Sequence, residues 1–101
     1  MKAYVNWFES DAKKARAATG DQTIRDGAVT VQFNPSPEHW LMSETEAREW
    51  CANLNRSGVS FDAFPDHVCK FQIEEVRPGE WAIVCNEHPH PVSGSPSELF
   101  S

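Results

Sequence analysis

The chain has 101 residues, which is enough for one domain with a single modest core. Apolar residues make up 40% of it and charged residues 24%, so the composition favours a folded domain over an intrinsically disordered chain. The formal net charge of −6 argues against a nucleic-acid-binding protein, which needs a basic surface.

The first predicted element is a helix over about residues 3–18. Basic residues gather toward the end of this segment, and Gly20 follows as a natural stop. A strand over residues 2–8 is the alternative, because apolar residues also alternate with their neighbours from Ala3 to Trp7. The helix depends on five apolar residues at helical spacing: Tyr4, Trp7, Phe8, Ala12 and Ala15.

Two short strands are predicted next, over residues 28–33 and 38–42. The first, AVTVQF, shows the alternation of β-branched residues that is typical of a strand. The second, EHWLM, follows a segment broken by two prolines. We expect these strands to form a hairpin that turns around Asn34 to Pro37.

The segment SETEAREWCANLNRSG predicts a second helix, from about Ser43 to Asn55. Ser43 is a natural N-cap, and Glu46 stands three residues later to complete a capping box. Gly58 supplies the C-terminal stop. Four apolar residues form the expected buried stripe: Ala47, Trp50, Cys51 and Leu54.

Residues 67–90, HVCKFQIEEVRPGEWAIVCNEHPH, predict a second hairpin that turns at RPGE, residues 77–80. With the first and last residues of this turn opposed, Ile73 faces Val84. One side of the hairpin then presents an apolar centre to the capped helix, made of Phe71, Ile73, Ala82 and Val84.

The same register places Cys69 opposite His88 and His67 opposite His90. A thiolate and three imidazoles that converge from two strands could bind tetrahedral zinc, which takes such sulfur and nitrogen ligands. A zinc-stabilised small domain is therefore the alternative to a hairpin whose open end carries these side chains without a metal. We expect the metal-free hairpin, and we assign no metal ligand and no cofactor.

Catalytic motifs are missing from the sequence, which has no phosphate-binding glycine loop, nucleophile elbow, HExxH or dinucleotide fingerprint. Cys69 with His88 would supply a thiol and a base. However, acidic neighbours disfavour a thiolate, and no glycine-rich turn offers an oxyanion site. We therefore predict a protein without enzymatic activity and assign no catalytic residue.

The elements follow the order α-β-β-α-β-β, which predicts an α+β fold: an antiparallel sheet of about four strands with helical cover on one face. Residues 1–92 are expected to form this single domain, and the serine- and proline-rich residues 93–101 a flexible tail. No apolar run approaches the roughly 20 residues that span a bilayer, and the first residues lack a signal peptide. We expect a cytoplasmic location.

Acidic side chains are concentrated in the C-terminal two-thirds of the chain. Residues 1–37 carry five basic and four acidic side chains, a balance of +1, whereas residues 38–101 carry four basic and eleven acidic ones, a balance of −7. Such a surface repels nucleic acid and anionic membranes, and it attracts a protein partner with a basic surface. The alternative is that the charge only maintains solubility. Five glutamates are the expected partner contacts: Glu44, Glu49, Glu74, Glu80 and Glu87.

The overall layout resembles the small acidic α+β proteins of phages and mobile elements, including anti-CRISPR inhibitors. Three stretches carry the resemblance: EHWLM, the segment SETEAREWCANLN that follows it, and the hairpin CKFQIEEVRPGEWAIVC. It covers roughly residues 28–87 and concerns architecture and composition, so it transfers no functional residue. The resemblance implies a non-enzymatic inhibitor of a nucleic-acid-handling complex, acting in the host cytoplasm if the protein is phage-encoded.

Overall fold

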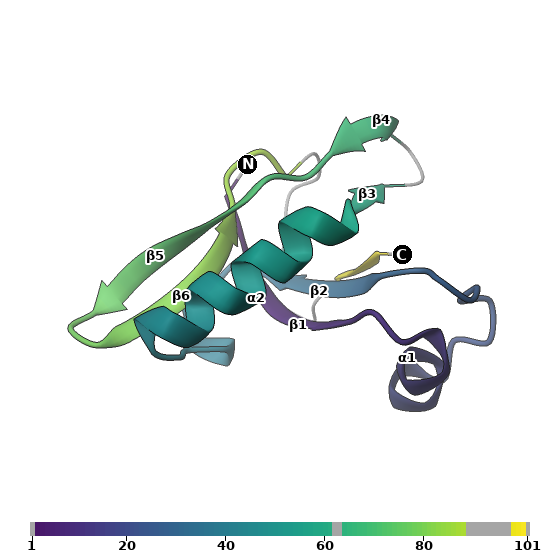
Figure 1. Ribbon diagram of the computed structural model, residues 1–101, viewed down its shortest axis with the longest axis horizontal. Coiled ribbons are helices and arrows are strands. Elements are labelled where there is room, and N and C mark those ends of the chain that lie inside the picture. Colours follow the sequence, from purple (N-terminus) through teal and green to yellow (C-terminus); the bar gives the residue numbers. More distant parts are fainter. Residues whose placement is uncertain (1, 62–63, 89–97, 101) are drawn as a thin grey trace.

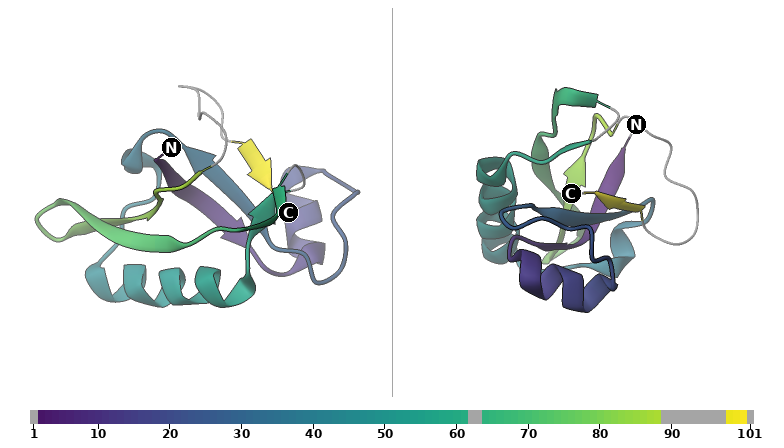
Figure 2. Two further views of the ribbon diagram at one scale, coloured as in Figure 1. Left: turned by 90° about the horizontal axis from the view of Figure 1, so that it is seen from above. Right: turned by 90° about the vertical axis from the view of Figure 1, so that its right-hand side faces the viewer.

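A computed structural model describes residues 2–61, 64–88 and 98–100 of the chain. The α+β class is confirmed, with an antiparallel sheet that a helix covers on one face (Figures 1 and 2). The described part of the sheet has five strands in the order β5-β6-β1-β2-β7. Their bounds are β1 Ala3–Glu9, β2 Thr30–Asn34, β5 Phe71–Arg77, β6 Glu80–Cys85 and β7 Glu98–Phe100.

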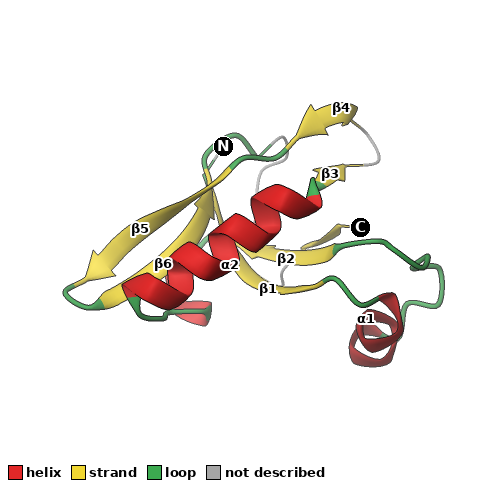
Figure 3. Cartoon of the chain, viewed as in Figure 1, coloured by secondary structure: helices red, strands yellow, loops and turns green. Residues whose placement is uncertain are grey.

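The other elements in the described part of the chain are two α-helices, a short 3-10 helix and a small two-stranded sheet (Figure 3). None of the described helices has both the length and the apolar character that crossing a membrane requires. Their bounds are α1 Ala12–Thr19, η1 Pro37–His39 and α2 Glu44–Ser57, with strands β3 Ser60–Phe61 and β4 Phe64–Val68.

The N-terminal segment begins with a strand, so the predicted helix over residues 3–18 is wrong in its first half. The pairing of β1 with β2 shifts register at Asn6, between Val5 and Trp7. This β-bulge adds one residue to the strand, so Val5 and Phe8 lie on the same buried face although they are three residues apart. A bulged strand therefore imitates helical spacing, and the helix α1 starts only after Asp11, whose side chain caps it.

The expected hairpin between residues 28–33 and 38–42 does not form. Strand β2 pairs with β1 and β7 instead. The second segment holds η1 and makes a single bridge, in which the backbone of Met42 exchanges hydrogen bonds of 2.9 and 2.8 Å with Trp81 of β6. Prolines on either side of Ser36 keep the chain out of a tight antiparallel return.

Helix α2 follows the prediction closely at its ends. The Ser43 hydroxyl accepts a hydrogen bond from the backbone N–H of Glu46 at 3.2 Å, and Gly58 closes the helix with φ of 72°. The buried stripe is narrower than expected, however. Trp50 remains 39% exposed, whereas three residues of the stripe are buried: Ala47, Cys51 and Leu54.

The main core lies between α2 and one face of the sheet. Its described members come from β1, β2, β5 and β6, together with α2 and the segments that flank β3 and β5. Their side chains include Val5, Phe8, Val31, Phe33, Leu54, Phe71 and Ile83. On the opposite face, Trp7 packs against a second, smaller cluster that α1 forms around Ala15.

The predicted β5–β6 hairpin is present, but its register differs from the prediction by one residue. Arg77 does oppose Glu80, yet Val76 is bulged out, so Ile73 pairs with Ile83 and Phe71 pairs with Cys85. Ile83 and Cys85 therefore join Phe71 and Ile73 on the face toward α2. Ala82 and Val84, which were expected there, point to the other face.

The domain boundary expected at residue 92 lies outside the described residues, as does most of the expected tail over residues 93–101. The described part of that tail, Glu98–Phe100, is strand β7, which pairs antiparallel with β2.

Candidate functional site

Three of the five glutamates expected to contact a partner are engaged within the protein. Glu44 binds Arg48 one turn along α2, and Glu80 binds Arg77 across the hairpin turn. Glu74 accepts hydrogen bonds from the ammonium group of Lys2 and, at 2.6 Å, from the hydroxyl of Tyr4. These carboxylates are already neutralised, so they contribute less to an external field than the sequence suggests.

Burial alone would raise the pKa of Glu74, but the hydrogen bonds from Lys2 and Tyr4 outweigh burial and leave that pKa below its usual value. In the same contact, burial and the hydrogen bond to Glu74 raise the pKa of the Tyr4 phenol. This group of three joins the start of the chain to β5, so its role is structural.

Two of the expected contacts, Glu49 and Glu87, are exposed and make no ion pair with the described residues. A third carboxylate, Glu75 of β5, shares these properties but was not among the predicted contacts. Both the predicted and the observed register place Glu75 on the α2 side, because it follows Phe71 and Ile73 at two-residue steps along β5. Glu46 is also exposed and without an ion pair among the described residues, but it accepts a hydrogen bond from the Ser43 hydroxyl. We call the other three, Glu49, Glu75 and Glu87, the free carboxylates.

Arg77 is the basic centre at the tip of the hairpin. Besides Glu80 it binds Glu38 of η1 with two hydrogen bonds of 3.0 and 2.9 Å. Hydrogen bonds from Arg77 lower the pKa of the Glu38 carboxyl. This bidentate contact fixes η1 against the hairpin, because a guanidinium group and a carboxylate match in geometry.

The predicted opposition of Cys69 and His88 depended on the register that the structure corrects. The Cys69 thiol instead contacts the Cys85 thiol, and both are buried in the core. This contact and burial raise the pKa of the Cys69 thiol. Buried His88 lies with its ring 4.6 Å from the ring of Phe33.

The zinc alternative loses the geometry on which it rested. His90 and the side chain of His67 lie outside what the structure describes. Within the described residues, no group of three or more His, Cys, Asp or Glu side chains lies close enough to hold a metal ion.

A partly exposed aromatic cluster lies beside the N-terminal half of α2. The Trp50 ring packs edge-on against Phe8 at a centroid distance of 5.0 Å and lies 5.6 Å from the Trp40 ring. Glu46 and Glu49 precede Trp50 on the exposed side of α2. An aromatic side chain held by its neighbours and bordered by charged groups is typical of an interface anchor.

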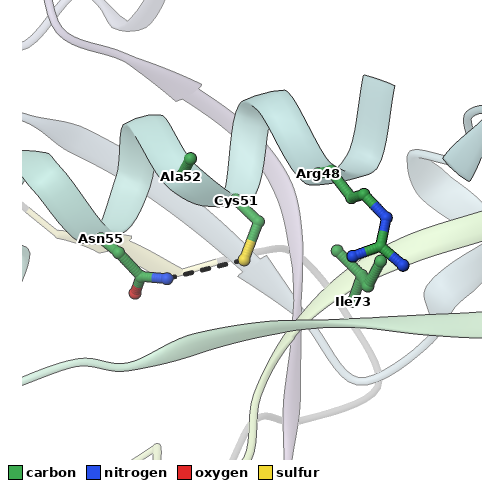
Figure 4. A pocket seen from close by; sticks show the side chains of 5 residues that line it. All are labelled: Arg48, Cys51, Ala52, Asn55 and Ile73. Carbon is green, nitrogen blue, oxygen red and sulfur yellow. Dashed lines mark hydrogen bonds between the residues drawn. The ribbon is translucent and has the colours of Figure 1, made fainter. Parts of the chain in front are cut away.

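A shallow groove of about 280 Å³ lies on the other side of α2, between this helix and β5 (Figure 4). It opens to solvent and is lined by Arg48, Cys51, Ala52, Asn55 and Ile73. In Figure 4 the Asn55 amide donates to the Cys51 sulfur at 3.6 Å. Cys51, Ala52 and Ile73 give the groove apolar walls, and Arg48 and Asn55 add polar groups. Its size and lining suit the side chain of a partner.

A second hollow, of about 310 Å³, lies between α1 and the sheet and is lined by Trp7, Ala18, Thr19 and Gln32. It carries no titratable side chain. The groove between α2 and β5 is therefore the better candidate, because exposed charges and an open strand edge adjoin it.

The described fold and surface define a small acidic α+β domain with a partly apolar groove between α2 and β5. Comparisons with family models, curated proteins and solved structures found no match for the chain.

Proposed function

We propose that the protein is a non-catalytic binding module that recognises a basic surface on a protein partner. The observation that supports this most is the group of free carboxylates, Glu49, Glu75 and Glu87, on the same helix and hairpin that carry the apolar groove. Unpaired exposed charges steer an oppositely charged partner, and an apolar contact then holds it.

The resemblance to small phage-encoded inhibitors makes the proposal more specific. The partner is a component of a nucleic-acid-handling complex, and the protein inhibits that complex by covering its basic surface in the cytoplasm of the host. Nucleic acid is not a ligand of the protein itself, because the formal net charge of −6 opposes a polyanion.

Comparative capture tests this proposal. The unmodified protein and a triple variant, Glu49→Lys, Glu75→Lys and Glu87→Lys, are each immobilised in the same cell lysate, and the bound proteins are quantified by mass spectrometry. We expect basic proteins to be enriched by the unmodified protein and lost by the variant.

The matched control places the same charge change at the α1 end of the molecule. The triple variant raises the formal net charge from −6 to 0, since each reversal adds two charges. A second variant with Glu9→Lys, Asp21→Lys and Asp26→Lys reaches the same net charge and should keep the partner, although it removes local contacts such as the Asp26–Arg16 ion pair. The proposal is wrong if both variants retain the partner, or if the unmodified protein binds duplex or single-stranded nucleic acid tightly at physiological salt.

A further inference from the structure

Strand β5 is an edge of the sheet in the described part of the chain, because it pairs with β6 on one side only. In an antiparallel pair, directly opposed residues either exchange both of their backbone hydrogen bonds or exchange none. Trp81, which opposes Glu75, has its N–H and C=O bonded to Met42 on the far side of β6. The N–H and C=O of Glu75 therefore point away from β6, toward the open edge.

The contacts of Phe71, at the other end of β5, confirm which residues of the strand direct their backbone groups to the open edge. The side-chain amide of Asn55 accepts a hydrogen bond from the N–H of Phe71 at 2.8 Å and donates one to the C=O of Phe71 at 3.1 Å. Asn55 thus takes the place that a residue of a neighbouring strand would occupy. The direction of the backbone N–H and C=O groups alternates along a strand. Three residues therefore direct these groups to the open edge: Phe71, Ile73 and Glu75.

Two of these three positions have no backbone partner among the described residues. At Phe71 the side chain of Asn55 already bonds the backbone. Beyond Glu75, a register shift ends the regular pairing of β5 with β6. Ile73 and Glu75 remain. The Ile73 side chain lines the groove, and the adjacent Glu75 carboxylate is one of the free carboxylates.

We propose that this edge binds an extended basic segment of the protein partner by strand addition. The segment would pair with the backbone of Ile73 and Glu75. An apolar side chain would enter the groove beside Ile73, and a lysine or arginine would contact Glu75. The inference rests on the proposed function, because it takes its basic partner from there and adds the mode of recognition.

Charge selects this occupant over a second copy of the chain. Pairing of two β5 edges would bring Glu75 of each copy to a common seam, between two chains that each carry a formal charge of −6. Like charges opposed across a strand pair are unfavourable. A basic segment places opposite charges at the same positions.

The test uses a capped peptide, Thr-Thr-Lys-Thr-Val-Thr-Thr, with the full chain. In antiparallel pairing its valine lies opposite Ile73 when its lysine lies opposite Glu75. Binding is followed by NMR shifts and amide hydrogen exchange. We expect slower exchange at the N–H groups of Ile73 and Glu75 in the presence of the peptide. We also expect about tenfold weaker binding when the backbone nitrogens of the peptide's lysine and valine are methylated, because methylation removes the N–H groups that would pair with β5.

A pair of variants separates backbone pairing from charge. Glu75→Pro removes the outward N–H without removing a hydrogen bond to β6, whereas Glu75→Gln removes only the charge. We expect Glu75→Gln to weaken the peptide by a few-fold and Glu75→Pro to weaken it further, at unchanged β5–β6 exchange protection.

Several results would overturn the inference. Equal binding of the methylated and unmethylated peptides would exclude strand addition. Slow exchange at Ile73 and Glu75 in the peptide-free protein, together with a dimeric mass in ultracentrifugation, would favour a second copy as the occupant. If the edge fails these tests while the triple reversal still releases the partner, the proposed function stands and only the mode of recognition is wrong.

Discussion

Trp50 and Leu54 are only one helical turn apart on α2, yet they differ in what they contribute. Leu54 has no exposed surface, whereas Trp50 is 39% exposed. The sequence predicts both as members of one stripe, because spacing reports the direction of a side chain and not how far the neighbouring surface extends. Trp50 reaches past the sheet to Phe8 and Trp40, so part of its ring faces solvent.

The two side chains should therefore differ in their effect on stability. Leu54→Ala leaves a cavity in the core and should lower the free energy of unfolding by about 2–5 kcal/mol. Trp50→Ala should cost less than the roughly 3–5 kcal/mol typical of a fully buried aromatic residue, because part of the ring is already hydrated. Denaturant unfolding measures both. A larger loss for Trp50→Ala than for Leu54→Ala would contradict this assignment.

Glu74 should make stability depend on acid pH. Its pKa in the folded protein is lowered, so its stabilising contribution is present above the unfolded-state pKa, for which the ordinary value is 4.5. That contribution is lost as the pH falls through the folded-state pKa. Glu74→Gln should destabilise the protein at neutral pH and have a smaller effect in acid. Melting temperatures across this range test the prediction, and an effect that is constant with pH would contradict it.

At the scale of the elements, Asn55 connects α2 to the start of β5. The predicted helix ended at this residue, but nothing in its spacing indicated that its amide bonds the backbone of Phe71. Such a contact joins residues sixteen positions apart and depends on tertiary placement alone.

Removal of this amide should loosen the junction between helix and strand. Asn55→Ala should cost about 1 kcal/mol of unfolding free energy, since water can replace part of the lost bonding at an exposed edge. Hydrogen exchange at Phe71 should accelerate. Asn53→Ala is the control, because among the described residues its side chain binds Arg56 on the helix surface and not β5. Equal exchange rates at Phe71 in the two variants would argue against the junction.

Local signals predicted the helix α2 and the β5–β6 turn, because caps and turn residues act over a few positions. The errors in strand assignment and register involve an inserted residue or a distant partner. The bulge at Asn6 made β1 read as a helix, and the bulge at Val76 shifted the hairpin by one residue. That single shift removed the predicted opposition of Cys69 and His88 and turned Ala82 and Val84 away from α2. Periodicity cannot reveal a bulge, since it assumes an uninterrupted repeat.

At the scale of the whole molecule, fewer acidic side chains are available to a partner than the sequence suggests. Of the five glutamates predicted to bind a partner, three form ion pairs within the protein: Glu44, Glu74 and Glu80. The field that a partner meets comes mainly from carboxylates without such pairs. This explains why the informative reversals are Glu49, Glu75 and Glu87, which can be changed without breaking an internal contact.

The central claim is that these free carboxylates recruit a basic protein partner, and its most direct test is the association rate constant with the captured partner, measured by stopped flow at increasing salt. We predict that the rate falls as salt rises, because screening shortens the reach of exposed charges to about 10 Å at 0.1 M salt. The triple reversal Glu49→Lys, Glu75→Lys and Glu87→Lys should associate slowly at every salt concentration. A triple variant that associates as fast as the unmodified protein, with the same salt dependence, would contradict the account.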